Sequence, residues 1–569
     1  MHIGLSEMFV SYFYSIHTIT ANIVTIEAFA PIQTSTLITT RRVLSYYKRS
    51  DKNTNTSTTS TSIAQRNKNE KLRLNAVQGD GNNNNNNNNK REIVSDSDSN
   101  SAEFCIVGEN VVTGCSSTPP NFGTESSTSA TTNLAKCICG AGSFALPHVF
   151  LEEGVLGGTL ALTACGGLAT LTMHSLADSK QKASEFILLE NEFLRENESE
   201  NENESENEIV ENESETVEND LQPVTSYVQL ARVALGESAA KVVFALTLSA
   251  SIGVCSTYLV FIGSTLESMS SDVETMNIVR QYLPDISKSS FELAAAAILF
   301  PLSCIRDYSV FAFTSALGVF AVVGGILVTL AYGILVDPGG GLSVAIESIE
   351  TLPMWPTSLS SAFGGSFGTI CYLFAINFLT FPVINSMKAP SEYNGAVSKA
   401  VAGVWVVNVI FSILALGFYR EQTQDLVLAN LDNGPYLSAL KLLLCVDLLF
   451  TFPIVFSSGR QILENAILGP EDASRDEVQW TRAAIVAGAV TSCYGLAQLG
   501  GFGAVANLVG GVAQGTLAFI MPPAIAIALS KKSGREEEMQ GVQKVGQYAV
   551  ATFGVSVVSA VTYFTFTGI

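Results

Sequence analysis

Long apolar stretches alternate with short polar ones from Thr131 to the end of the chain. A membrane-spanning helix needs about 20 mainly apolar residues, within a range of about 17–25. Stretches of this length predict about eleven spanning helices, whose ends are defined to within a few residues. They lie near 131–152, 155–177, 239–266, 290–305, 308–335, 362–387, 396–419, 436–458, 480–499, 503–530 and 544–567. The stretch 290–305 is short and is also compatible with a re-entrant segment. No period-two alternation indicates strands, and a helix satisfies its backbone within itself, so we predict an all-α multi-pass membrane protein.

Two polar tracts differ from these apolar stretches, one before them and one between them. Residues 1–130 contain a Ser/Thr-rich run, Thr54–Ser62, and an asparagine run, Asn82–Asn89, neither of which has apolar residues to bury. Residues 185–220 carry fifteen acidic side chains and one base, Arg195, which accounts for most of the net charge of −21. Both compositions are typical of disorder. We therefore predict a disordered tail over 1–130 and a transmembrane domain over 131–569, with a disordered acidic insert at 185–220.

The start of the tail allows a second interpretation. Residues 8–30 are fairly apolar and end in Ala28-Phe29-Ala30-Pro31, before a Ser/Thr-rich stretch with basic residues. This order resembles the two-part targeting presequences of algae with secondary plastids. The apolar part has no preceding Lys or Arg, unlike a usual signal peptide. Whether residues 1–31 are a cleaved presequence or part of the disordered tail stays open.

Composition narrows the function classes. The chain is 47% apolar and 15% charged, against about 25% charge in soluble proteins. The acidic balance and the lack of a basic stripe argue against nucleic-acid binding. The cysteines in the apolar stretches have no metal-binding spacing and are expected to pack as small apolar residues. No nucleophile–base pair, metal motif or cofactor loop is visible, so we expect neither an enzyme nor a bound cofactor.

Basic residues predict the orientation, because cytosolic loops are enriched in Lys and Arg. The loops on one side of the predicted helices hold fourteen basic residues: Lys180, Lys182, Arg195, Arg232, Arg306, Lys388, Lys399, Arg460, Arg475, Arg482, Lys531, Lys532, Arg535 and Lys544. The other side holds four, namely Arg280, Lys288, Arg420 and Lys441. The N-terminal tail and the acidic insert are therefore expected in the cytosol. The three Asn-Glu-Ser sequons at Asn197, Asn203 and Asn212 would then not meet the glycosylation machinery.

The first and sixth apolar stretches are both interrupted. Gly140, Gly142 and Pro147 weaken the first as a helix, and several glycines, Asn377 and Pro382 interrupt the sixth. Unwound backbone at membrane depth is tolerated when it is buried or lines a cavity. Paired interruptions in corresponding halves indicate the midplane site of a transporter. The alternative is that the glycines only permit close helix packing.

Three polar residues in the apolar stretches are candidates for ion coupling. Lys136 lies one turn before Gly140, where a charge is costly and usually functional. Asp447 lies near the centre of the eighth stretch and Thr451 one turn later. A carboxylate at this depth is a candidate proton acceptor. The alternatives are that Lys136 extends to the membrane surface and that Asp447 pairs structurally with Lys441 or another polar neighbour.

Four short motifs carry a resemblance to a known family. They are Asn133-Leu-x-Lys136-x-x-x-Gly140-x-Gly142-x-x-x-Leu146-Pro147, then Leu299-Phe-Pro301 with Arg306, Asn385-Ser-Met387-Lys388-x-Pro390 and Thr451-x-Pro453. With these motifs, residues 131–569 resemble the amino acid transporter transmembrane family, also called the amino acid/auxin permease family.

The resemblance implies eleven helices in an inverted five-plus-five repeat and symport of an amino acid with Na⁺ or H⁺. It implies that the substrate carboxylate binds amides at Gly140, Ala141 and Gly142, and that the ammonium faces carbonyls between Phe374 and Asn377. Sodium-coupled relatives typically have Asn in place of Lys136, paired with a Thr in place of Thr451. Lys136 matches the proton-coupled and vacuolar branches, so H⁺ is favoured over Na⁺.

These observations predict a proton-coupled amino acid transporter embedded in a lipid bilayer. The alternative from another class is an amino-acid sensor that signals through its cytosolic tail and acidic insert. A vacuolar or plasma membrane is expected, or a plastid envelope if residues 1–31 are a presequence.

Overall fold

The computed structural model describes residues 105–107, 110–112, 123–201, 224–270, 287–305, 312–335, 341–431, 434–468, 476–532 and 541–567. The chain divides into one unit of residues 35–121 and another formed by 1–34 with 122–569. In the first unit, β1 (Cys105–Val107) and β2 (Asn110–Val112) form an antiparallel hairpin with Ile106 opposite Val111. The sequence analysis does not predict this hairpin. The candidate presequence lies outside the described residues.

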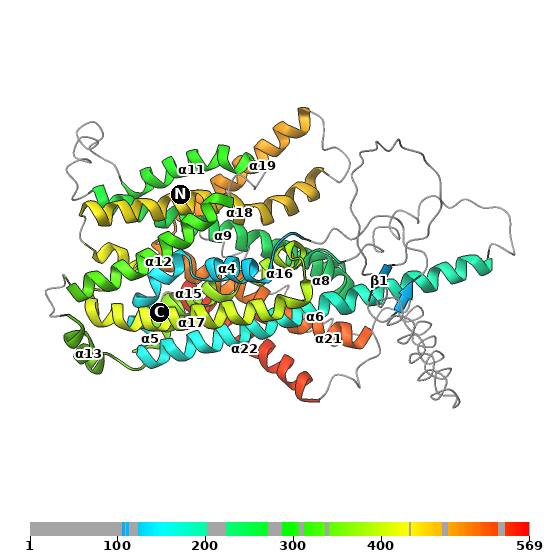
Figure 1. The fold of residues 1–569 in the computed structure, drawn as a ribbon, viewed down its shortest axis with the longest axis horizontal. Helices are drawn as coiled ribbons and strands as arrows, with labels where there is room; N and C mark the ends of the chain where they lie inside the picture. Colours follow the sequence, from blue (N-terminus) through cyan, green and yellow to red (C-terminus); the bar gives the residue numbers. More distant parts are fainter. Residues whose placement is uncertain are drawn as a thin grey trace, which may run out of the picture. The chain divides into compact units, whose positions relative to one another are not determined.

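In the second unit, each predicted apolar stretch coincides with a helix or a run of helices (Figure 1). In chain order they are α4–η1–α5 (Ser127–Ile138, Ala141–Ala145, Leu146–Glu153), α6 (Val155–Asn201), α9 (Glu237–Ser270), α11 (Lys288–Cys304), α12 (Ala312–Leu335), α14–η3–α15–η4–α16 (Leu359–Ser361, Ala362–Ser366, Phe367–Phe374, Asn377–Leu379, Thr380–Ser386), α17 (Tyr393–Tyr419), α18 (Pro435–Leu468), α19 (Asp476–Ala497), α20–η8–η9–α21 (Phe502–Leu508, Val509–Gln514, Thr516–Ile520, Met521–Lys532) and α22 (Gly541–Thr567). Two further helices, α8 (Tyr227–Leu235) and α13 (Gly341–Thr351), are not predicted by the apolar pattern.

Within the described residues, nine of these segments are long and apolar enough to cross a membrane. α11 and α19 are not among the nine, and α11 is only 17 residues long. The all-α multi-pass fold is therefore confirmed, whereas the number eleven and the inverted repeat stay predictions.

The first apolar stretch is a broken helix. Ser126 caps α4, because its side chain accepts a hydrogen bond from the backbone N–H of Ser129 at 3.2 Å. The helix ends at Ile138, its C-cap residue Cys139 has ψ 61°, and Gly140 takes a non-helical conformation with ψ −148°. The chain resumes as η1 and then α5, with Pro147 in the first turn of α5 where its missing N–H costs least.

The sixth stretch is broken as well. α15 ends at Phe374, its C-cap residue Ala375 has ψ 56°, and the helical path resumes at η4 before α16. The segment η3 ahead of α15 has π-helical hydrogen bonding, which often marks functional positions. Both predicted interruptions are confirmed.

The helices enclose three apolar clusters. α17 packs along α4, α5 and α6, while α18 packs against α9 and α12. Figure 1 also shows α6 extending well past its neighbouring helices. This extension includes residues 185–201, for which the sequence analysis predicts disorder. Glu and Leu in this stretch are good helix formers, which explains the difference. Residues 202–220 of the insert lie outside the described residues.

Candidate functional site

Lys136 and Asp447 form an ion pair between the first and eighth apolar segments. Lys136 Nζ lies 3.2 Å from Asp447 Oδ1, and the two side chains are 11% and 4% exposed. Thr451, one turn further along α18, donates its hydroxyl to the same carboxylate oxygen at 3.3 Å. The three residues predicted for ion coupling thus lie together, and their roles stay predictions. Lys441, the alternative partner, donates instead to the carbonyl of Leu431 at 3.1 Å.

Gly318 of α12 packs directly against the ion pair, so that α12 is the third helix in contact with it. A Cβ atom at this position would collide with the carboxylate of Asp447 and with Nζ of Lys136. Only glycine therefore lets α12 approach the pair this closely. The sequence analysis missed Gly318. Its signal is a small residue in a strongly apolar helix, which is typical of close helix packing.

The ion pair is a neutral unit with one proton-accepting group. Isolated charges are costly in a low-dielectric interior, so each partner lowers the cost of burying the other. A proton on Asp447 would cancel the carboxylate charge and leave Lys136 as an unbalanced cation beside the break in helix one. The arrangement can therefore link the protonation of Asp447 to the state of the unwound segment.

The two helix breaks approach one another. A Cβ built on Gly142 would lie 2.9 Å from Leu373 Cδ1 and 3.3 Å from the ring of Tyr372, both in α15. The Tyr372 hydroxyl hydrogen-bonds Thr257 of α9 at 2.7 Å, which ties α15 to a third helix. The segment η1, directly after the break in helix one, is therefore held against the turn of α15 that precedes the second break.

The predicted substrate-binding residues line these breaks. Gly140 precedes η1, whose first residues are Ala141 and Gly142, and the first N–H groups of a helix have no partner within it. The Phe374 side chain is fully buried and packs on Gly166 of α6, so the predicted contact would fall to its backbone carbonyl, which already accepts from the N–H of Ile376 at 2.8 Å. Asn377 is also fully buried and donates its amide to Thr172 at 3.0 Å. Its Oδ1 has no hydrogen-bond partner among the described residues.

A comparison with known protein families identifies the family to which this chain belongs. The family model "Transmembrane amino acid transporter protein" matches residues 123–186 and 211–567. The chain belongs to this family. The match leaves out residues 187–210, which fall within the acidic insert.

The names of individual relatives of this transporter-family chain describe amino acid transporters, and some of the names also mention the vacuole. It is similar to the amino acid transporter ANT1 of Arabidopsis thaliana, with 26% identity over 70% of this chain and 83% of the relative. It is similar to the amino acid transporter AVT3C of the same plant, with 23% identity over 74% of this chain and 86% of the relative. The vacuolar amino acid transporter 3 of Saccharomyces cerevisiae is 23% identical over 61% of this chain and 48% of the relative.

Two of the motifs behind the resemblance meet at Glu125 in this family member. The backbone N–H of Glu125 donates to Ser386 O at 2.9 Å, and its carbonyl accepts from the N–H of Lys388 at 2.8 Å. The Glu125 carboxylate accepts from the Ser386 hydroxyl at 2.6 Å and from the Asn133 amide. The segment before α4 thus joins the start of the first motif to the Asn-Ser-Met-Lys piece at the end of α16. Glu125 lies outside both motifs, so the sequence analysis did not single it out.

Asn507 of α20 binds the sixth segment and was also missed. Its Oδ1 accepts from the N–H of Gly368 at 2.7 Å, and its amide donates to the carbonyls of Phe363 at 3.2 Å and Gly364 at 2.9 Å. These carbonyls belong to η3, where π-helical winding disturbs the usual backbone pairing. A single polar amide in an apolar helix was the available signal.

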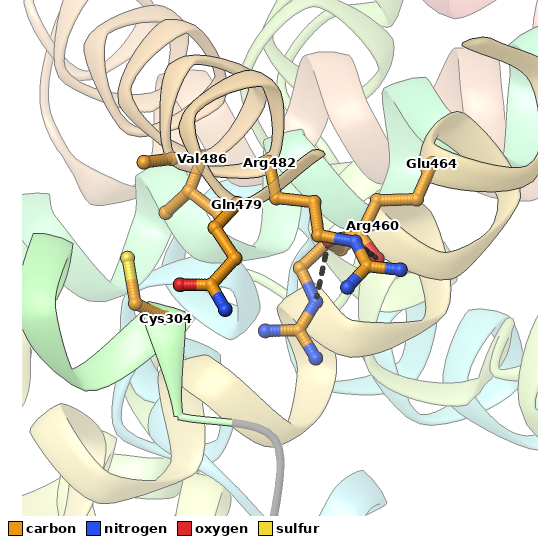
Figure 2. A pocket seen from close by; sticks show the side chains of 7 residues that line it. Cys304, Arg460, Glu464, Gln479, Arg482 and Val486 are labelled. Carbon is orange, nitrogen blue, oxygen red and sulfur yellow. Dashed lines mark ion pairs between the residues drawn. The ribbon is translucent and has the colours of Figure 1, made fainter. Parts of the chain in front are cut away.

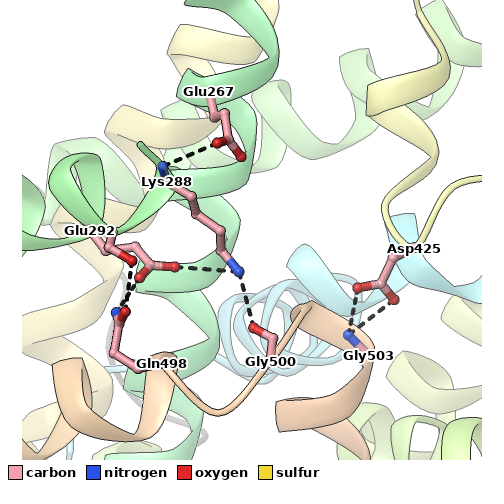
Figure 3. A network of polar contacts seen from close by, with 8 residues as sticks. Glu267, Lys288, Glu292, Asp425, Gln498, Gly500 and Gly503 are labelled. Carbon is pink, nitrogen blue, oxygen red and sulfur yellow. Dashed lines mark hydrogen bonds and ion pairs between the residues drawn. The ribbon is translucent and has the colours of Figure 1, made fainter. Parts of the chain in front are cut away.

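A separate polar network joins the ends of α9, α11 and α19 (Figure 3). Lys288 contacts Glu292 at 3.6 Å and donates to the carbonyl of Gly500 at 3.0 Å, while Gln498 donates to Glu292 at 2.5 Å. Nearby, both oxygens of Asp425 accept from the N–H of Gly503 and cap α20. These contacts fix helix ends on the side predicted to face away from the cytosol.

Proposed function

We propose that the protein is a secondary active transporter that moves amino acids across its membrane with the help of a proton gradient. The contact of Lys136, Asp447 and Thr451 beside the broken first helix carries this proposal. Membership of the transmembrane amino acid transporter family and the names of the relatives support an amino acid as the substrate.

An amino acid brings one carboxylate and one ammonium group, and the two breaks offer complementary backbone groups. Amides at Gly140, Ala141 and Gly142 suit the carboxylate, because a helix N-terminus attracts negative charge. Carbonyls between Phe374 and Asn377 suit the ammonium group. Because backbone groups recognise both charged groups, the residues around Gly142 and Tyr372 would select the substrate by its side chain.

Lys136 favours the proton over Na⁺ as the coupling ion. Its ammonium group already occupies the position beside Asp447 and Thr451 that a bound metal cation would need. Protonation of Asp447 cancels its charge and releases Lys136 toward the helix break. In this mechanism the proton and the substrate carboxylate act on the same cation, which couples their binding.

The vacuolar names among the relatives support a vacuole-like membrane as the location. The basic residues support a cytosolic N-terminal side. Imaging a C-terminally tagged chain beside vacuolar and plasma-membrane markers tests the compartment. Labelling of the plasma membrane alone would contradict the vacuolar assignment.

Uptake by the purified full chain in proteoliposomes tests the transport proposal. A radiolabelled amino-acid mixture is supplied under a pH gradient or a Na⁺ gradient, with protein-free liposomes and a proton ionophore as controls. Accumulation under the pH gradient, abolished by the ionophore, is expected. Accumulation that requires Na⁺ would overturn proton coupling, and none under either gradient would overturn active transport.

A further inference from the structure

Glu153, the last residue of α5, carries a buried carboxyl group that the proposed transport mechanism does not use. The residue is 4% exposed. The chain turns directly after it, since Gly154 has φ 76° and the N–H of Val155 donates to the carbonyl of Pro353 at 3.0 Å. This contact holds the corner between α5 and α6 against the segment ahead of α14. The backbone that carries Glu153 is therefore fixed at a buried position.

Glu153 has no basic partner within the part of the chain that the structure describes. Three other little-exposed carboxylates each have one: Asp447 pairs with Lys136, Glu292 with Lys288, and Glu464 with Arg460 and Arg482. Figure 2 shows Glu464 of α18 beside its two arginines. A buried carboxylate without such a partner is costly to keep charged.

The helices that pack on α5 carry their bases elsewhere. The first base of α6 is Lys180, roughly 38 Å along the helix from its start. His148 of α5 contacts the carbonyl of Thr423, just past α17, at 3.1 Å, so α5 lies beside the C-terminal end of α17. The base of α17, Lys399, is roughly 30 Å from that end. Exposed Arg420 follows α17 and forms no ion pair with Glu153 in the described structure.

The titratable groups close to Glu153 are acidic. Glu152 precedes it in α5 and accepts from the hydroxyl of Ser361 in α14. The thiol of Cys165 in α6 is close enough to Glu153 for an electrostatic interaction, and the sulfur of Cys371 in α15 lies 3.8 Å from that of Cys165. Negative charge on any of these groups repels negative charge on Glu153.

Ser366 of η3 connects Glu153 to the start of the sixth segment. Its buried Oγ lies 3.0 Å from Oε1 of Glu153 and 2.9 Å from the carbonyl oxygen of Ala362. A serine hydroxyl has only one proton to donate. A charged Glu153 accepts this proton and takes it from Ala362. A neutral Glu153 can instead donate to Ser366, which then donates to Ala362, so that both contacts are satisfied at once.

We propose that Glu153 is a second proton-binding group, which in its neutral form holds α5 against the start of the sixth segment. α5 follows the first helix break and η3 precedes the second, so this contact joins both broken segments on the side predicted to face away from the cytosol. Loss of the proton leaves a buried charge beside Glu152 and removes the Ser366 donor from Ala362.

The contact is therefore stable at low pH and loosens as the pH rises. A role as a gate for the substrate rests on the proposed function, whereas the proton-dependent contact itself does not.

Hydrogen exchange of the purified full chain, measured by peptide mass spectrometry, tests the contact without a transport assay. Peptides from residues 359–374 are followed from about pH 5 to about pH 8, within the range in which buried carboxyl groups titrate. Labelling times are adjusted for the pH dependence of exchange in an unstructured chain. Protection of η3 in the wild type is expected to fall about tenfold as the pH rises. Protection that does not change with pH would overturn the proposal.

Glu153→Gln separates the proton on Glu153 from other effects of pH. Its amide can donate to Ser366 as a neutral carboxyl group does, and it does not titrate, so η3 should stay protected at every pH. Ser366→Ala removes the connecting hydroxyl and should give faster exchange without pH dependence. Glu347→Gln is the matched control, because Glu347 is exposed on α13 of the same predicted side, and it should behave as the wild type.

The variants also give the results that contradict the proposal. A wild-type pH dependence in Glu153→Gln, or loss of that dependence in Glu347→Gln, would overturn it. Either result would leave proton-coupled transport through Asp447 unaffected, since that proposal is tested by uptake.

Discussion

Lys136 and Asp447 are each tolerable inside the membrane domain because the other is present. Removing one partner of a buried ion pair costs about 3–5 kcal/mol, since an uncompensated charge remains. Replacing both partners with apolar residues of similar volume is often neutral. Transport, in contrast, needs the titrating carboxylate itself. Stability and coupling at this pair are therefore separable by single and double substitutions.

Asp447→Asn is expected to abolish amino acid uptake driven by a pH gradient, because the proton acceptor is gone. It should also lower the melting temperature of the purified protein, because Lys136 loses its counter-charge. The double variant Lys136→Met with Asp447→Leu should regain much of that stability and still transport nothing. Wild-type rates of pH-driven uptake in Asp447→Asn would exclude Asp447 as the coupling group.

Gly318→Ala tests how tightly the third helix closes on the pair. The added methyl group collides with the Asp447 carboxylate, and overpacking of this kind costs about 1–3 kcal/mol. Gly324→Ala is a matched control in the same helix, because its Cβ would meet nothing closer than Leu440 Cδ1 at 3.8 Å. Thermal unfolding of both variants in detergent should show a loss for Gly318→Ala alone. Equal melting temperatures would mean that α12 can move away from the pair at no cost.

At the scale of helices, the broken sixth segment depends on a neighbour to satisfy its backbone. Asn507 supplies hydrogen bonds to one N–H and two carbonyls that irregular winding leaves exposed to an apolar interior. Each buried polar group left without a partner costs about 1–3 kcal/mol. The tenth helical run, which contains π-helical η8 and η9, thus stabilises the π-helical start of the sixth segment directly.

Asn507→Ala is therefore expected to reduce stability strongly, measured as a lower melting temperature and less folded protein on size-exclusion chromatography. Asn408→Ala serves as the control, since Asn408 is equally buried in α17 but its amide atoms have no hydrogen-bond partner among the described residues. That substitution removes no hydrogen bond within the described residues and should cost less. A similar loss in both variants would show that burial, and not the contacts of Asn507, sets the effect.

At the scale of the whole molecule, hydropathy predicted most of the helices and few of the side-chain contacts between them. The positions of the apolar helices and both interruptions followed from composition, because membrane depth fixes helix length and glycine weakens helices. The partner of Asp447 could not be predicted, since it depends on how α4 and α18 rotate toward each other. Gly318 and Asn507 were missed for the same reason: their importance lies in the neighbouring helix, which one sequence does not reveal.

The orientation of the whole molecule is the remaining prediction, and the acidic insert offers a way to test it. If the insert faces the cytosol, the sequons at Asn197, Asn203 and Asn212 stay unmodified when the chain is made in yeast. The loop between α9 and α11 is predicted on the opposite side, and Val279→Thr completes a sequon there with Asn277. Glycosidase treatment should then shift the electrophoretic mobility of the Val279→Thr variant and leave the wild type unchanged. A shift of the wild type would invert the assigned orientation, and with it the side of the membrane on which the contact between Glu153 and Ser366 lies.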